Sequence, residues 1–253
     1  MKTLKMEFYK IKRRKTGLTL GAMTAVQFLW CVWAFRGPDE YERLQGWLGT
    51  LYSMPLLNSI MMPTIMAVLA SRLADIEHKG NTYKQLRTLR NAGTLFNAKV
   101  LCGLLFILMM YAAQLLFLIL LGHSLHYEGR PDMGLYLRYL FLSIACTFAL
   151  YLLQLTLSML FFNQMIPLVT GLCGSMLGLI LMYLYNWNLR SLFPWGGYIA
   201  TMFVGADWNP QTRIMTYYLM ETSENGLLSH GFIFLWAAVF YITGRWLFTR
   251  REA

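Results

Sequence analysis

Charged side chains are scarce in this chain, which excludes an ordinary soluble domain. Asp, Glu, Lys and Arg make up 13% of the 253 residues, about half the share that soluble proteins carry. Hydrophobic residues make up 57%, and the mean hydropathy is +0.45. Most of the chain must therefore lie in the hydrocarbon of a membrane. At about 20 residues per helical span, there is room for roughly five to seven spans but not for an additional soluble domain.

The chain also lacks the short motifs of common enzymes. The nucleotide-binding pattern G-x-x-x-x-G-K-[ST] is absent, and neither H-E-x-x-H nor G-x-S-x-G occurs. His123 and His126 have i, i+3 spacing with Glu128 nearby, but no third strong metal ligand is evident, and an interfacial position explains them as well. We therefore expect no catalytic residue, metal site or bound cofactor in this chain.

Uncharged runs mark the expected spans. Residues 44–71 form a run of 28 that contains Pro55 and Pro63, which can kink a spanning helix. Residues 139–189 hold 51 residues without a charge, too many for one span but enough for two helices joined by a tight turn at residues 162–167. We expect an all-α integral membrane protein, a single transmembrane domain over residues 1–253, with six spans at residues 17–35, 44–71, 100–122, 139–162, 166–187 and 227–244.

Basic residues fall mainly on one side of these spans. Seven Lys or Arg lie in residues 1–16, six in residues 71–99 and three in the C-terminal tail, so that sixteen of the 22 share one side. Eight of the twelve acidic residues lie on the other side. By the positive-inside rule the side rich in Lys and Arg faces the cytoplasm, and an even number of spans agrees. We therefore expect both termini to be cytoplasmic.

Residues 1–16 precede the first apolar run without the cleavage site of a secretion signal, so we expect an uncleaved segment. Leu4, Phe8 and Ile11 fall on one face of a helix with basic residues around them. This pattern predicts an interfacial helix lying on an anionic membrane surface. A simple basic topology signal would explain the same residues.

A charged island separates the second and third apolar runs. Residues 71–99 carry six basic and two acidic residues. Their apolar residues recur at a spacing that predicts short amphipathic helices broken near Gly80. We expect this island to dock on a soluble partner, although a solvated loop explains any one of its charges. The periodic apolar residues are Leu73, Ile76, Tyr83, Leu86 and Leu89.

Residues 190–225 form the longest loop on the opposite side. Within this loop, residues 191–206 are apolar but only 16 long, which suits a re-entrant hairpin better than a span. We expect residues 214–220 to form a second half-helix. An ordinary loop of the aromatic belt is the alternative. The bend of the hairpin is expected at Pro194, Trp195, Gly196 and Gly197.

Ionisable side chains are nearly absent from the spans, which argues against coupling to protons or sodium. Polar amides remain, and their simplest role is to hold helices together. The fifth span has a face of small residues that permits close packing within the protomer or with a second subunit. The amides are Gln27, Asn58, Gln114, Gln154, Asn163 and Gln164, and the small residues are Gly171, Gly174 and Gly178.

Taken together, the six spans, the interfacial helix, the island and the re-entrant element resemble the permeases of ABC-2 type exporters. In that family the loop after the second span typically contains an acid, Lys or Arg followed by Gly, a Thr, a Leu-rich helix and a Lys that opens the third span. The stretch EHKGNTYKQLRTL looks especially like the lantibiotic-protection permeases of bacterial self-immunity exporters. Residues 90–92 depart from the family, which often has Pro after the Leu-rich stretch. The pattern is matched by Glu77, Lys79, Gly80, Thr82, Leu86 and Lys99.

The resemblance implies a cytoplasmic coupling segment at residues 72–99, on which two ABC ATPase subunits act with their ATP and Mg. It implies a permease of the bacterial plasma membrane, without an ATPase site of its own, that expels or extracts an amphipathic peptide such as a lantibiotic. A second permease, identical or homologous, and membrane lipid are implied partners, and nucleic acid is not. Alternatives are another hydrophobic substrate, a sensor or scaffold permease that regulates a kinase, and an intramembrane enzyme acting on lipid-linked substrates. The residues expected to couple to the ATPase are Glu77, Lys79, Gly80, Thr82, Tyr83, Lys84 and Leu86.

Overall fold

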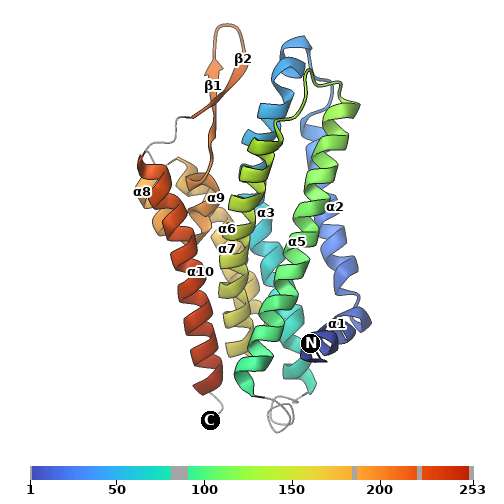
Figure 1. Cartoon of the computed structure of the whole chain (residues 1–253), viewed down its shortest axis with the longest axis vertical. Coiled ribbons are helices and arrows are strands. Elements are labelled where there is room, and N and C mark those ends of the chain that lie inside the picture. Colours follow the sequence, from blue (N-terminus) through green and yellow to red (C-terminus); the bar gives the residue numbers. More distant parts are fainter. Residues whose placement is uncertain (1, 81–90, 184–186, 221–223, 251–253) are drawn as a thin grey trace.

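The computed structural model describes residues 2–80, 91–183, 187–220 and 224–250. Figure 1 shows a bundle of long helices, with α1 lying across one end and a β hairpin projecting beyond the other. The first and last described residues both lie at the α1 end. We call this end the basic end and the opposite one the hairpin end.

In the described part of the chain, six helices are long and apolar enough to cross a membrane. This number and the mostly helical structure confirm the expected class of integral membrane protein. The six helices are α2 (Thr16–Ala34), α3 (Glu40–Gly80), α5 (Ala92–Ser124), α6 (Met133–Leu160), α7 (Met165–Met182) and α10 (Glu224–Arg250).

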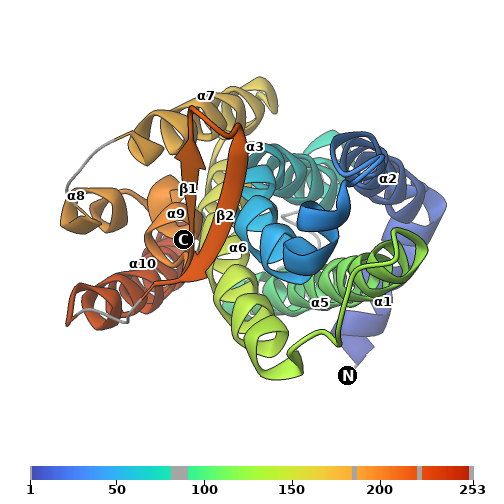
Figure 2. The same ribbon diagram turned by 90° about the horizontal axis from the view of Figure 1, so that it is seen from above.

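Helices α3 and α6 form the centre of the bundle. In their most apolar stretches, 67% and 61% of the residues are buried, against 17% to 33% in the other four helices. Viewed from above, α2 and α5 lie on one side of this central pair and α7 and α10 on the other (Figure 2). Helix α3 continues through Pro55 and Pro63. It packs mainly on α6 and α7, so it is the element through which the two sides of the bundle meet.

The tight turn expected near residues 162–167 joins α6 to α7. Helix α6 ends at Leu160, and the side-chain oxygen of Asn163 accepts a hydrogen bond from the backbone N–H of Met165 at 3.0 Å. Pro167 lies in the first turn of α7, where a missing backbone N–H leaves no hydrogen bond unmade.

At the basic end, α1 (Lys2–Arg13) is an amphipathic helix that packs on α5. Ile11 is buried, and the ring of Phe8 stacks on that of Phe106 with 6.2 Å between centroids. The chain then turns sharply into α2 through Lys15, which adopts the left-handed conformation with φ of 52°. Two residues of the apolar face predicted for residues 1–16, Phe8 and Ile11, therefore contact the helical bundle.

Short helical turns follow α7 at the hairpin end, in α8 (Trp187–Leu192), η1 (Pro194–Gly196) and α9 (Gly197–Ala200). The chain bends at Gly196, where a Cβ would overlap the carbonyl of Arg190. Helix α9 is fully buried and packs on α3, α6 and α10. A compact helical element therefore precedes the sixth span, inserted among the long helices.

The prediction of a second half-helix at residues 214–220 was wrong. Strands β1 (Val204–Asn209) and β2 (Ile214–Leu219) form an antiparallel hairpin instead. Ile, Thr and two Tyr favour an extended strand in β2. The turn is fixed by the side chain of Asn209, which accepts hydrogen bonds from the backbone N–H groups of Gln211 and Thr212. A short apolar run such as residues 214–220 fits either a helix or a strand.

Candidate functional site

Four charged side chains form a buried cluster at the basic end, where α1, α3 and α5 meet. Helix α1 contributes Glu7 and Lys10, the last turns of α3 contribute Glu77, and the second turn of α5 contributes Lys99. The Lys99 ammonium lies 3.0 Å from a Glu7 carboxylate oxygen and 2.8 Å from one of Glu77. The Lys10 ammonium lies 2.8 Å from the other oxygen of each carboxylate. We call these four residues the ion cluster.

Each charge in the ion cluster is matched by an opposite charge. The side chains of Glu7, Glu77 and Lys99 are at most 2% exposed, and that of Lys10 is 21% exposed. Lys99 has three N–H donors, and all three are used because it also donates to the Leu73 carbonyl oxygen at 2.7 Å. A buried ion pair is tolerated when its hydrogen bonds are complete, whereas an unpaired buried charge is strongly destabilising. The cluster therefore holds three helices in one arrangement.

Neighbouring opposite charges in the ion cluster shift the pKa of Glu77 and of Lys10 toward the charged form. Burial alone would raise the pKa of the Glu77 carboxyl, but the ammonium groups of Lys99 and Lys10 outweigh it, and the pKa lies below its ordinary value. Burial alone would lower the pKa of Lys10, but the carboxylates of Glu77 and Glu7 outweigh it, and that pKa is raised. Glu77 and Lys10 therefore stay charged at neutral pH.

A second set of charges lies at the rim of the ion cluster. The Arg14 guanidinium contacts the Asp75 carboxylate at 2.6 Å, and the Lys79 ammonium lies 3.0 Å from the same carboxylate. Arg72 donates to the backbone oxygen of Arg14 at 3.2 Å. These contacts also join the end of α1 to the end of α3.

The residues expected to couple to an ATPase differ in where they lie. Glu77 points into the ion cluster, whereas the Lys79 side chain is 70% exposed and Gly80 is exposed at the end of α3. These positions do not test the predicted role in coupling to an ATPase, which stays a prediction. Four of the expected residues lie outside the described residues: Thr82, Tyr83, Lys84 and Leu86.

Sequence reasoning missed the role of α1 in this site. Glu7 is the only acidic residue among the first sixteen, which otherwise hold seven basic ones. A lone carboxylate in a basic amphipathic helix was a signal that this face has a buried partner. Its buried partner Lys99 is 92 positions away along the chain, and Glu77, the second carboxylate bound by Lys99, is 70 positions away, so spacing alone could not identify them.

A buried network of amides and a tyrosine joins four helices in the middle of the bundle. Asn58 on α3 accepts hydrogen bonds from Gln27 at 2.6 Å and from Gln114 at 3.2 Å. It donates to the Tyr139 hydroxyl at 2.8 Å, and that hydroxyl donates to Gln114 at 3.0 Å. The prediction that polar amides in the spans hold helices together is confirmed for three of them, Gln27, Asn58 and Gln114.

A second buried network holds the inserted helical element. The Thr147 hydroxyl on α6 lies 2.7 Å from the Tyr111 hydroxyl on α5 and 2.6 Å from the Tyr198 hydroxyl on α9. All three side chains are at most 1% exposed. Helix α9 is therefore anchored to the central helices by hydrogen bonds as well as by packing.

The small-residue face of α7 contacts the same chain. A Cβ at Gly171 would lie 2.9 Å from the Pro63 carbonyl oxygen on α3, and a Cβ at Gly174 would overlap the indole of Trp195. Gly178 lies against the backbone of Trp195 and Ser59. These glycines bring α7 against α3 and η1 within the protomer.

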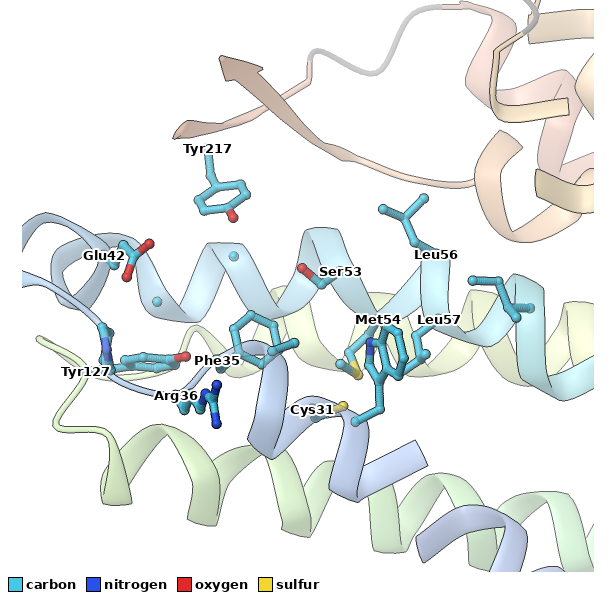
Figure 3. A pocket seen from close by; sticks show the side chains of 16 residues that line it. Cys31, Phe35, Arg36, Glu42, Ser53, Met54, Leu56, Leu57, Tyr127 and Tyr217 are labelled. Carbon is cyan, nitrogen blue, oxygen red and sulfur yellow. The ribbon is translucent and has the colours of Figure 1, made fainter. Parts of the chain in front are cut away.

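The hairpin end contains a cleft of about 390 Å³ between the end of α2, the first half of α3 and strand β2. Figure 3 shows Glu42 and Arg36 toward one end of the cleft and Met54 and Leu57 farther along α3, with Tyr217 of β2 above. The cleft is lined by Trp30, Cys31, Ala34, Phe35, Arg36, Pro38, Glu42, Gly46, Gly49, Ser53, Met54, Leu56, Leu57, Ile60, Tyr127 and Tyr217.

Within the described residues, no group of three or more His, Cys, Asp and Glu side chains is arranged to hold a metal ion. The ring of His123 instead packs edge-on against Trp47 at 5.7 Å. His126 lies in the loop after α5, in the left-handed conformation with φ of 58°. The ion cluster is neutral and fully paired, so it suits a structural connection between helices better than acid or base chemistry.

Comparison with known protein families identifies the class of this chain. Residues 3–178 match the family model described as ABC-2 family transporter protein. The match covers well over half of the chain, so the chain belongs to the ABC-2 transporter family. Searches of curated proteins and of solved structures gave no match.

Membership in the family defines the general role of the chain. It is a multi-pass membrane permease, and the permease domains of this family carry no catalytic ATPase site. ABC-2 permeases generally pair with ABC ATPase subunits. In transporters of this family the energy for transport therefore comes from the ABC ATPase and not from the permease domain.

Proposed function

We propose that this chain is the permease subunit of an ATP-driven exporter that expels or extracts an amphipathic membrane-active peptide, in the manner of lantibiotic self-immunity. The observation that best supports a coupled transporter is the ion cluster. Glu77 lies three residues before the end of α3 at Gly80 and is tied to α1 and α5. Any force applied just beyond Gly80 would therefore reach three helices at once.

In this proposal the basic end faces the cytoplasm. Sixteen of the 22 Lys and Arg residues belong to that side by sequence, and the positive-inside rule favours such an orientation. Two ATPase subunits, with their ATP and Mg, would bind there. Lys79 and Gly80 are exposed at the end of α3 and would contact them, together with Thr82, Tyr83, Lys84 and Leu86. Glu77 would act from inside, by holding the position of this segment.

The cargo would move along apolar surfaces and leave or enter at the hairpin end. The spans carry few charges, which favours a largely apolar cargo. The helical element at Pro194, Trp195, Gly196 and Gly197 lies close to that end and is inserted among the long helices. A second permease, identical or homologous, would complete the pathway. The choice of a lantibiotic-type peptide rests on the stretch EHKGNTYKQLRTL.

Survival of cells exposed to antimicrobial peptides tests this function. Cells that express the permease with its ATPase and any partner permease should tolerate a lantibiotic better than cells with a hydrolysis-dead ATPase. Lys79→Glu combined with Leu86→Asp should remove protection and weaken co-purification of the ATPase. The matched control is Arg213→Glu, a charge reversal in the hairpin turn at the other end.

Two outcomes would redirect the proposal. Unchanged tolerance to a panel of cationic peptides, with the assembled complex verified in the membrane, would point to another hydrophobic substrate of the same exporter. Normal ATPase binding and stimulation by the double variant would remove the coupling role of this segment and favour a sensor or scaffold permease.

A further inference from the structure

The cleft at the hairpin end is long and narrow. Along α3 it runs from Glu42 to Ile60, a length of about 27 Å at 1.5 Å per residue. A volume of about 390 Å³ spread over that length leaves the width of an extended chain, not of a folded peptide. Trp30 and Ile60 line it and are 55% and 39% exposed. Both lie in uncharged stretches of candidate membrane spans, so the open side of the cleft faces lipid.

Polarity changes along the cleft. Its deeper part is apolar, with Cys31 and Met54 each 1% exposed at its floor. Its other end carries one positive side chain, Arg36, and one negative side chain, Glu42. Among the described residues, neither of these two charges has an ion-pair partner. The Arg36 guanidinium lies 6.0 Å from the centre of the Trp33 ring, and Glu42 accepts a hydrogen bond from the Asp39 backbone N–H at 3.2 Å.

We propose that this cleft binds one phospholipid from the leaflet at the hairpin end. One acyl chain lies along the apolar part, between α2 and α3. The headgroup lies at the charged end, with its phosphate toward Arg36 and its amine toward Glu42. A zwitterionic headgroup such as phosphoethanolamine complements both charges, whereas phosphoglycerol complements only the positive one.

The dimensions of a bilayer favour a lipid over other ligands. A bilayer is about 40–45 Å thick with its headgroups, so one leaflet spans roughly half of that. The cleft begins at Glu42 in the first turn of α3, next to the start of the uncharged run 44–71. It reaches the level of Leu57 and Ile60, near the middle of that run. It therefore covers the depth of one leaflet, and a lipid can occupy it by lateral diffusion without entering water.

The headgroup must supply the selectivity. An acyl chain gains little by leaving the surrounding lipid, because lipid is as apolar as the cleft. The charge contacts at Arg36 and Glu42 differ between one headgroup and another, so a specific site discriminates between headgroups and an ordinary lipid-facing surface does not. This difference gives the proposal its test.

Photo-crosslinking in nanodiscs measures occupancy of the cleft. The purified chain is reconstituted with phosphatidylethanolamine or phosphatidylglycerol that carries a diazirine in one acyl chain, and adducts are mapped by mass spectrometry. We expect phosphatidylethanolamine adducts at residues 56–60 to exceed those on the exposed face of α7, at Leu172 and Met176, after normalisation to bulk lipid. Ser53→Phe, and independently Leu56→Trp, should narrow the cleft and reduce adducts there while leaving α7 labelling unchanged.

Charge variants test the headgroup. Glu42→Gln keeps an acceptor for the Asp39 N–H, as Gln does in capping boxes, but removes the negative charge. The preference for phosphatidylethanolamine over phosphatidylglycerol should fall by about two- to fivefold, the range that an exposed charge contact supplies. Arg36→Gln should reduce labelling by both lipids. Arg130→Gln, in the loop after α5, is the control and should change neither.

Three results would overturn the proposal. Equal labelling of the cleft and the α7 face would mean that only bulk annular lipid is present. Labelling that survives both Ser53→Phe and Leu56→Trp would place the lipid elsewhere. Absence of lipid adducts in the cleft, combined with crosslinking of an added lantibiotic to residues 53–57, would make the cleft a cargo site instead.

Discussion

Among single residues, Lys99 is a buried charge whose hydrogen-bond donors are all used. Its side chain is 2% exposed, and its three donors are directed to Glu7, Glu77 and the Leu73 carbonyl. Its own carbonyl oxygen accepts a hydrogen bond from the Tyr151 hydroxyl at 2.7 Å. One residue thus joins contacts from α1, α3, α5 and α6. Because every donor already has an acceptor, no smaller or uncharged side chain can replace it without leaving buried carboxylates unpaired.

Replacing Lys99 with Met should therefore destabilise the protein strongly. The loss of one partner from a buried ion cluster costs about 3–5 kcal/mol, because the Glu7 and Glu77 carboxylates would remain with Lys10 alone. The midpoint of thermal unfolding in detergent measures this change. Lys79→Met is the matched control, since its exposed contact with Asp75 is worth at most about 1 kcal/mol. Equal midpoints for the two variants would contradict the role assigned to the ion cluster.

The ion cluster should also limit stability at both extremes of pH. The pKa of Glu77 is lowered by folding, so its contribution is complete above the unfolded value of about 4.3 and is lost as the pH falls through the lower folded value. The pKa of Lys10 is raised, so its contribution is complete below about 10.4 and is lost as the pH rises through the higher folded value. Unfolding midpoints of the wild type and Glu77→Gln should differ at neutral pH and converge in acid. A constant difference across the acid range would contradict the paired state of Glu77.

At the scale of elements, the position of α7 depends on the absence of side chains. Gly171 allows the helix to approach the Pro63 carbonyl. Pro63 itself has no backbone N–H, so it donates no hydrogen bond to the carbonyl one turn earlier in α3. Gln154 adds a polar link from α6: with its amide oxygen and nitrogen assigned by their hydrogen-bond partners, that is, exchanged, the amide donates to Pro167 O at 2.9 Å and accepts from Gly171 N at 3.2 Å. Close approach and amide contact together hold α7 to the central helices.

Gly171→Leu should push α7 away from α3. The Cβ alone would lie 2.9 Å from both the Ala67 Cβ and the Pro63 oxygen, and overpacking of this kind costs about 1–3 kcal/mol. A lower unfolding midpoint and weaker crosslinking between cysteines on α3 and α7 are expected. Leu172→Ile, on the exposed face of the same helix, should change neither. Normal crosslinking in Gly171→Leu would show that α7 is held by other contacts.

The helices could be predicted from the sequence, and the site could be predicted only in part. A charge is costly in hydrocarbon, so uncharged runs mark spans without any knowledge of contacts. The strand at Ile214–Leu219 escaped prediction because a short apolar run fits either a strand or a helix. The ion cluster escaped because Glu7 on α1 is paired with Lys99 of α5 and Lys10 on α1 with Glu77 of α3, and such pairing depends on how the helices pack.

At the scale of the whole molecule, the two ends differ in character. The basic end carries the ion cluster, α1 and the paired charges of Arg14, Asp75 and Lys79. The hairpin end carries the cleft, the inserted helical element and the β hairpin. This asymmetry is consistent with a permease that receives force at one face and meets its cargo at the other.

Thiol labelling of intact cells tests the orientation of the two ends. In a variant that lacks the four native cysteines, Gln211→Cys in the hairpin turn should react with an impermeant reagent added outside. Lys79→Cys at the end of α3 should react only after the cells are permeabilised. Both positions are exposed, so a difference in labelling reports sidedness rather than burial. The reverse pattern would invert the orientation and place the coupling segment outside the cell.

Helix α3 is much longer than a membrane is thick. Its 41 residues extend about 62 Å at 1.5 Å per residue, roughly twice the hydrocarbon thickness. One end holds Glu77 in the ion cluster, and at the other the Tyr41 hydroxyl lies 3.1 Å from that of Thr216 while Gln45 accepts a hydrogen bond from the Tyr217 N–H at 2.7 Å. The helix is thus attached to the ion cluster at one end and to the β hairpin at the other. A tilt of about 5° about one end would displace the other end by about 5 Å, the rise of a full turn of helix. A movement at the ion cluster would therefore displace the hairpin on the opposite face of the membrane.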